Sequence, residues 1–341
     1  MRTKENPKKR IIWLDYLRAF ACFLVAVGHL LKSMPNAGIM EENWLLSGFV
    51  QVIYHFHVAL FFFVSGYLFQ RSSERCATLK EYGRRKFLRL VDLVIPYIIF
   101  SVINYVIKVI VGDSVNDAVT TSLWETLLLS PIAQMWFLYA LAMVTLVTPA
   151  MRSNKGCVAL IAAAVAVKVI GMFPALRLVD ATNYILWHEL WYVAGMLWAF
   201  KGIRMNWLWT LLSAVAFAVV CAFEFIQGSL NGVLETAATL TGILMCVGFF
   251  QLVTEKRERL SPVWSILARY MMQIYLLHTI FAAGVRIVLM QLGVMNAPIH
   301  LMLGFAASFV GPVICAWIAE RTKVLNFVFF PSKTISAMTR K

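Results

Sequence analysis

Apolar residues occur along this chain in runs of about twenty, separated by short polar turns. Each run is long enough to cross the hydrocarbon core of a membrane as a helix, in which the backbone satisfies its own hydrogen bonds. The runs lack the period-two alternation of a membrane β-barrel. The pattern predicts an all-α polytopic membrane protein with about ten transmembrane helices, at residues 11–32, 49–70, 88–111, 131–149, 157–173, 184–200, 207–227, 233–253, 265–290 and 299–319.

The polar insertions between these runs are short. The longest are residues 33–48, 70–89 and 112–130, and the last of these ends in a possible interfacial helix, SLWETLLLSP. There is no internal repeat and no low-complexity tract. We therefore expect residues 1–341 to form a single membrane domain with no appended soluble domain.

Composition and charge placement support this picture. Of the 341 residues, 61% are hydrophobic and 14% charged, which excludes a soluble domain. The formal net charge of +14 does not indicate nucleic acid, because 24 of the 31 Lys and Arg residues lie in the N-terminal run, the alternate turns that follow it and the C-terminal tail. This is the positive-inside asymmetry, and it predicts cytoplasmic N- and C-termini. The opposite turns carry Glu41, Glu42, Asp113, Asp117 and Asp180, with Arg177 as an exception.

The first predicted helix is unusual because it contains Asp15, Arg18 and His29. Ionisable groups inside a membrane are costly and usually mark a functional site. Arg18 and His29 are eleven positions apart, so they share one helix face about 16 Å apart along the axis, with Asp15 on the same side. A neutral imidazole at His29 is suited to act as a general base. A hydrogen-bonded histidine at the interface and an ion pair between Arg18 and Asp15 are the structural alternatives.

A second cluster of charge lies at GRRKFLRL, where the third helix is expected to begin. Arg84, Arg85, Lys86 and Arg89 place four cations within six residues. Cations beside backbone N–H groups at a helix N-terminus can bind phosphate. Anchoring to anionic headgroups is the commoner role of such residues, and it explains Arg89, at the edge of the apolar run, less well than Arg84.

Four further ionisable residues lie in later predicted helices. His188 and Glu189 stand among tryptophans near the predicted outer face, and both are candidates for substrate binding, with Glu189 as an acceptor-site carboxylate. His278 falls near mid-membrane with Arg286 two turns beyond it, which makes both candidates for substrate binding. The six cysteines are scattered, so we expect neither disulfides nor a metal site. No P-loop, GxGxxG or zinc-protease motif is present.

Five motifs follow one another across nearly the whole chain: LDYLRAFACFLVAVGHL (14–30), FFFVSGYLF (61–69), RRKFLRL (84–90), WFLYAL (136–141) and IYLLH (274–278). The first contains an Arg and a His separated by ten residues. In order and spacing, the set resembles the acyltransferase-3 family of integral-membrane O-acyltransferases, which modify sugars and surface polysaccharides. The ten-helix membrane domain of that family agrees with the count made from hydropathy.

The resemblance implies an activity and a site. His29 is then the catalytic histidine and Arg18 its essential partner, with Asp15 as a third catalytic residue. Arg85 and Arg89, next to Arg84, help bind the phosphates of cytoplasmic acyl-CoA. His29 would deprotonate an acceptor hydroxyl that attacks the acyl carbonyl, and an acyl-histidine intermediate stays open. The expected donor is acetyl-CoA, used as a co-substrate with no tightly bound cofactor. The expected acceptor is a cell-surface polysaccharide or lipid-linked sugar at the bilayer of a bacterial plasma (inner) membrane.

Two other classes of function fit some of these residues. A transporter or exporter of a glycan or lipid-linked sugar would also line its pathway with His, Arg and Glu. Transporters often contain inverted repeats and paired broken helices, and neither is evident here. A membrane sensor or ligand-binding module is a weaker alternative because no signalling domain is attached. The sequence favours the enzyme.

Overall fold

The computed structural model describes residues 11–112, 121–173 and 180–338, and these residues contain helices but no strand. The basic run at residues 1–10 and the residues Asp113, Asp117 and Arg177 lie outside the described ranges. The helices are α1 (Ile12–Asn36), α2 (Trp44–Ser73), α3 (Leu79–Val111), α4 (Leu123–Leu128), the 3-10 turn η2 (Ala133–Met135), α5 (Trp136–Val147), α6 (Asn154–Gly171), α7 (Asp180–Lys201), α8 (Trp207–Gln227), α9 (Gly232–Val253), α10 (Pro262–Gln291), α11 (Ala297–Ala319), α12 (Lys323–Phe329) and α13 (Pro331–Met338).

Eight of the described helices are long and apolar enough to cross a membrane: α1, α2, α3, α6, α8, α9, α10 and α11. The chain is therefore an all-α polytopic membrane protein, as the hydropathy predicts. The other two expected crossings are also helical, but α5 has only 12 residues. Such a helix is about 18 Å long, which is shorter than the roughly 30 Å hydrocarbon core.

After α5 the chain continues through residues 148–152, which have no regular secondary structure, and Thr148 is in the extended conformation. Polar side chains of α2 and α3 replace the missing helical hydrogen bonds. The buried amide of Gln70 pairs with both the N–H and the carbonyl of Met151, each at 2.9 Å. The ammonium of Lys86 donates to the carbonyl of Thr148 at 3.2 Å. Non-helical backbone at membrane depth is tolerated where protein groups satisfy it in this way.

Helix α3 begins earlier than its apolar run suggests. The hydroxyl of Thr78 accepts a hydrogen bond from the N–H of Glu81, whose carboxylate accepts one from the N–H of Ala77. This cap starts the helix at Leu79 instead of residue 88. The basic cluster therefore lies in the second and third turns of α3, where backbone N–H groups are already used in the helix.

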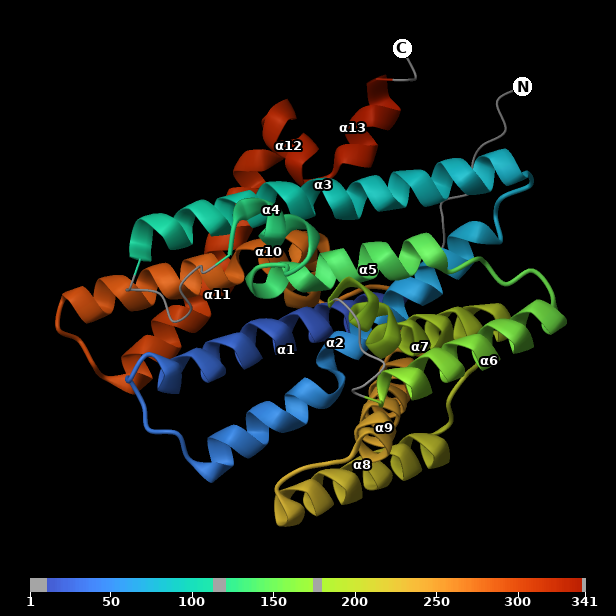
Figure 1. Ribbon diagram of the computed structural model, residues 1–341, viewed down its shortest axis with the longest axis horizontal. Helices are drawn as coiled ribbons and strands as arrows, with labels where there is room; N and C mark the ends of the chain where they lie inside the picture. The colour runs from blue at the N-terminus through green and yellow to red at the C-terminus, as the bar shows by residue number, and fades with distance from the viewer. Residues whose placement is uncertain (1–10, 113–120, 174–179, 339–341) are drawn as a thin grey trace.

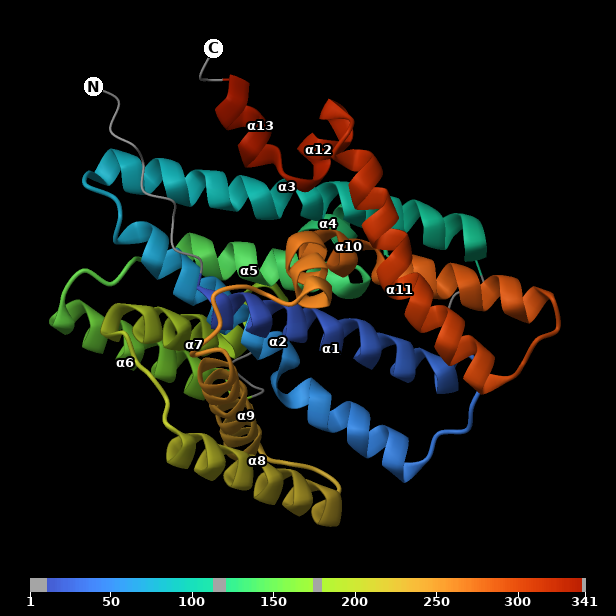
Figure 2. The same cartoon turned by 180° about the vertical axis from the view of Figure 1, so that it is seen from behind.

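Helices α1 and α2 run through the middle of the bundle, with α3 along one side and α8 and α9 on the other (Figures 1 and 2). The short helices α12 and α13 lie across α3. The α2–α3 and α5–α6 turns lie at one end of the bundle, which is on the right in Figure 1. We call this the basic end, because Arg71, Arg85 and Arg152 lie there. The α1–α2 and α10–α11 turns lie at the opposite end.

Two glycines allow α2 and α7 to pack with their backbones in contact. A Cβ atom at Gly66 would collide with the backbone of Tyr192, and one at Gly195 would collide with the backbone of Phe63. Small residues at helix crossings are the usual means of close approach in membranes. This crossing holds the aromatic motif of α2 against α7.

Candidate active site

His29 lies in a cluster of rings formed by three helices. The ring centroid of His29 is 5.4 Å from that of His278 on α10 and 6.3 Å from that of Tyr54 on α2. Tyr54 in turn lies 4.7 Å from His57, one turn further along α2. We call His29, Tyr54, His57 and His278 the histidine cluster.

Hydrogen bonds to backbone carbonyls fix the orientation of two of these imidazoles. Nδ1 of His278 lies 3.0 Å from the carbonyl oxygen of Ile274 and 2.8 Å from that of Tyr275. Nδ1 of His57 lies 2.8 Å from the carbonyl oxygen of Ile53. A carbonyl only accepts, so Nδ1 is the donor in both rings and Nε2 is the acceptor in their neutral forms. Nε2 of His278 is buried and has no partner among the described residues.

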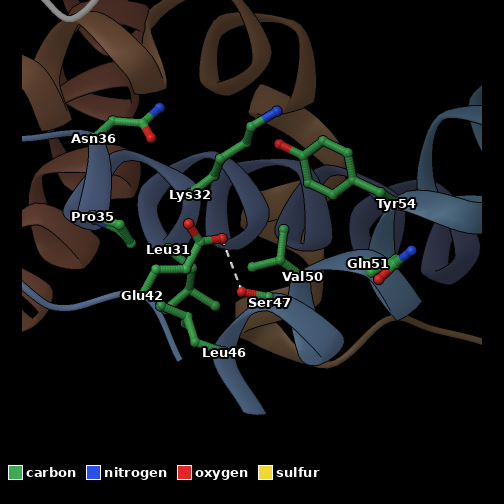
Figure 3. Close-up of a pocket in the computed structure, with 10 residues that line it drawn as sticks. All are labelled: Leu31, Lys32, Pro35, Asn36, Glu42, Leu46, Ser47, Val50, Gln51 and Tyr54. Atoms are coloured by element: carbon green, nitrogen blue, oxygen red, sulfur yellow. Dashed lines mark hydrogen bonds between the residues drawn. The ribbon is translucent and has the colours of Figure 1, made fainter. Parts of the chain in front are cut away.

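Tyr54 connects the histidine cluster to a cleft between α1 and α2 (Figure 3). The cleft has a volume of about 270 Å³. Figure 3 shows the side chains of Lys32 and Tyr54 on the same side of the cleft, and the Lys32 ammonium is 5.4 Å from the centre of the Tyr54 ring. Across the cleft, the Ser47 hydroxyl donates to Glu42 at 2.9 Å. The cleft is lined by Leu31, Lys32, Pro35, Asn36, Glu42, Leu46, Ser47, Val50, Gln51 and Tyr54.

Arg18 lies on the same helix as His29, but outside the histidine cluster. Its guanidinium is 3.5 Å from the carboxylate of Asp15, at a spacing of three residues. The structure thus contains the ion pair that the sequence offers as an alternative. Cys22, one turn after Arg18, donates from Sγ to the carbonyl of Met271. Met271 follows a kink at Tyr270 in α10, so this face of α1 is fitted against an irregular part of its neighbour.

The basic cluster of α3 divides into exposed and inward-facing cations. Arg84 and Arg85 are exposed, and Arg85 donates to the carbonyl of Ser72 at 3.0 Å. Arg89 is only partly exposed and donates to the carbonyl of Ser65 at 2.8 Å. Its Nε is buried without a partner among the described residues. Arg89 is therefore held inside the bundle against α2, whereas Arg84 and Arg85 face the surroundings of the basic end.

A second cavity lies between α2, α6, α7 and α9, on the other side of Tyr54. Its volume is about 400 Å³. His188 lines it, with its ring stacked on Phe62 at a centroid distance of 4.5 Å and 5.4 Å from the ring of Trp136. We call this space the α2–α7 cavity. Its lining residues are Tyr54, His55, Val58, Ala59, Lys168, Trp187, His188, Trp191, Glu235 and Thr239.

The remaining predicted site residues lie in different surroundings. Glu189 is buried and accepts a hydrogen bond at 3.2 Å from the hydroxyl of Thr148, at the end of α5. It is therefore not among the residues that line the α2–α7 cavity with its neighbour His188. Arg286 is buried and donates to the carbonyl of Ser33 at 3.4 Å, which joins α10 to α1 one turn beyond His29.

His57 and Tyr54 are not among the site residues that the sequence predicts. The sequence feature that could have identified His57 is the pair His55 and His57. These residues are two positions apart, so they point to different sides of a helix. In the structure His57 is 2% exposed within the histidine cluster. His55 instead bonds the carboxylate of Glu224 on α8, which also accepts from Gln51. Periodicity identifies two faces, but it does not show which of them meets α1.

The family model of the acyltransferase-3 acyltransferase domain matches residues 11–320, nearly the whole chain. The chain belongs to the acyltransferase-3 family. This assignment establishes a membrane acyltransferase, and the motifs that carry the resemblance lie on α1, α2, α3, α5 and α10 of the structure. No curated protein and no solved structure matches the chain.

In this acyltransferase the histidine cluster has the composition needed for proton transfer. His29 is partly exposed, whereas His57 and His278 in the same cluster are buried. If His29 takes up a proton, the acceptor nitrogens of neighbouring neutral imidazoles can stabilise and orient the resulting imidazolium.

No three His, Cys, Asp or Glu side chains in the described part of the chain are arranged to hold a metal ion.

Proposed function

We propose that this protein transfers an acyl group, with acetyl as the first expectation, from acyl-CoA to a hydroxyl of a cell-surface polysaccharide or lipid-linked sugar. The proposal places it in a bacterial plasma membrane and makes His29 the general base. The main support for this proposal is the contact of His29 with His278 and Tyr54. These three residues lie on three helices that all contain family motifs. Arg18, on the same face of α1, lies on the path from the basic end to that cluster.

The proposed reaction is a transfer of the acyl group from sulfur to oxygen. His29 accepts the proton of the acceptor hydroxyl as the oxygen forms a bond to the acyl carbonyl carbon. The C–S bond of the thioester then breaks, and the CoA thiolate leaves and receives the proton. The products are the O-acylated acceptor and CoA with a free thiol. Direct transfer and transfer through an acyl-histidine both give these products, with the same bonds broken and formed overall.

The donor is proposed to enter from the basic end. Arg84 and Arg85 are exposed there and suit the phosphates of CoA, since guanidinium groups bind phosphate in a bidentate manner. Arg85 contacts the carbonyl of Ser72, which is 15 residues from His57 on α2, or about 22 Å along the helix. Arg89 contacts the carbonyl of Ser65, about 12 Å from His57 by the same measure. The pantetheine arm would cover this interval with the thioester foremost.

The test is transfer of labelled acetyl from acetyl-CoA into envelope glycans, with membranes that contain wild-type protein or His29→Gln. Loss of a general base typically lowers the rate by about 10²–10⁴-fold. His300→Gln is the matched control, because this buried histidine of α11 bonds the carbonyl of Val294 and is not part of the histidine cluster. We expect wild type and His300→Gln to transfer label and His29→Gln to lose transfer while inserting at the same level.

Two results would contradict the proposal. Near-wild-type transfer by His29→Gln would remove this residue from the chemistry. Absence of transfer from acetyl-CoA and succinyl-CoA to any glycan, together with movement of a labelled lipid-linked sugar across the membrane, would instead identify a transporter.

A further inference from the structure

We infer that the α2–α7 cavity binds an uncharged pyranose unit of the acceptor, held on the tryptophans of α7. This inference rests on the proposed function and specifies where its acceptor binds. The cavity of about 400 Å³ falls in the usual range for small-molecule sites, and aromatic side chains with a few polar groups form its walls. The α1–α2 cleft is smaller, at about 270 Å³, and no tryptophan lines it.

Two tryptophans form the aromatic wall. Trp187 and Trp191 are one turn apart on α7, and both line the cavity. The ammonium of Lys168 donates to the carbonyl of Trp187 at 3.4 Å and lies 5.6 Å from the centre of the Trp191 ring. Lys168 therefore ties α6 to the backbone of α7 at this wall. A pyranose ring presents a face of C–H groups that packs on such indole surfaces.

The polar groups of the cavity suit hydroxyls and disfavour ions. Lys168 and Glu235 place one charge of each sign in the lining, so a charged ligand would meet a like charge as well as an opposite one. A neutral ring avoids this conflict of charge, and its hydroxyls can bond to the ammonium and the carboxylate.

Position links the cavity to the reaction. Tyr54 lines the α2–α7 cavity, and its ring is also 6.3 Å from that of His29. Tyr54 is thus shared by the cavity and the histidine cluster, and the inference requires a sugar bound on α7 to reach His29 beside it. The thioester would approach the same cluster from the basic end, so donor and acceptor would meet at His29 from different directions.

The test uses the full chain in lipid nanodiscs and the methyl glycosides of glucose, galactose, mannose and N-acetylglucosamine. Saturation-transfer NMR reports weak binding and shows which ring protons touch the protein. We expect at least one glycoside to bind through the C–H face of its ring. Trp187→Ala should weaken that binding by about tenfold, the loss typical of an aromatic anchor, and Trp187→Phe should restore much of it. Trp209→Ala is the control, because Trp209 is 60% exposed on α8, outside the cavity.

The outcomes separate this inference from the proposed function. If none of the four glycosides binds, or if Trp187→Ala and Trp209→Ala bind equally well, the inference is overturned even when acetyl transfer is intact. In active membranes, Trp187→Ala should raise the KM for the glycan acceptor and leave the KM for acetyl-CoA unchanged. Glycoside binding that depends on Trp187, in a protein that transfers no acyl group, would support the cavity and refute the reaction.

Discussion

At the scale of single residues, His29 and His278 differ in exposure and in how their side chains are held. His29 is partly exposed, whereas His278 is 1% exposed and held by two backbone carbonyls. In the proposed reaction His278 would position the base, in place of the substrate-binding role expected from the sequence. We predict that His278→Gln lowers kcat by about tenfold to a hundredfold, less than His29→Gln does, and leaves the KM for acetyl-CoA unchanged.

A pH profile distinguishes positioning from simple structural support. Loss of a neighbour that stabilises the protonated base should shift the acidic limb of the kcat profile, since that limb reports the base in the bound complex. A lower kcat with an unshifted profile and a reduced melting temperature would assign His278 to packing alone. His300→Gln again provides a buried histidine outside the histidine cluster for comparison.

Arg89 is the residue of the basic cluster whose contacts most constrain its role. It donates to the carbonyl of Ser65 inside the bundle, within the FFFVSGYLF motif of α2. We predict that Arg89→Ala raises the apparent KM for acetyl-CoA by about tenfold or more, because a charged hydrogen bond near the donor path is lost. Lys155→Ala, an exposed basic residue at the same end, should leave this KM unchanged. If the KM for acetyl-CoA is the same in both variants, Arg89 would be assigned to membrane anchoring instead of donor binding.

At the scale of elements, the α2–α7 crossing depends on two glycines. A Cβ at Gly66 would overlap the backbone of Tyr192, which cannot move as a flexible side chain would. We predict that Gly66→Ala lowers stability by about 1–3 kcal/mol, the usual range for overpacking, and reduces transfer because α7 is displaced from α2. Gly83→Ala is the matched control, since a Cβ there meets nothing within 4 Å. Thermal unfolding of both variants in nanodiscs would measure the difference, and equal melting temperatures would refute the close crossing.

The sequence predicted the helices better than it predicted their ends or their neighbours. All ten expected segments overlap helices because long apolar runs are a strong signal. The early start of α3 came from a cap at Thr78 in a polar stretch, which hydropathy does not register. The early end of α5 depends on Gln70 of α2, 81 residues from its partner Met151. Such distant contacts cannot be read from a local pattern.

The candidate site shows the same division at the scale of the whole molecule. The sequence placed Arg18 and His29 on one face of the first helix and selected His278 separately. His29 and His278 meet only because α1 and α10 lie side by side. Cys22 and Met271, which join these two helices, are 249 positions apart in the chain. Tyr54 and His57 were missed because a helix that is apolar on most sides does not reveal which face meets a neighbour.

Orientation in the membrane is the remaining property of the whole molecule on which the proposed reaction depends. Lys155 is exposed at the basic end, and the positive-inside asymmetry predicts that this end faces the cytoplasm. Ser130 is exposed between α4 and α5, on the predicted outer side of the membrane. We predict that, in a chain with its six native cysteines replaced, a membrane-impermeant maleimide labels Ser130→Cys in intact cells and Lys155→Cys only after permeabilisation. The reverse pattern would place Arg84 and Arg85 outside, away from cytoplasmic acyl-CoA. Because acyl-CoA is made in the cytoplasm, that single result would rule out donor entry at the basic end even if His29 proved essential.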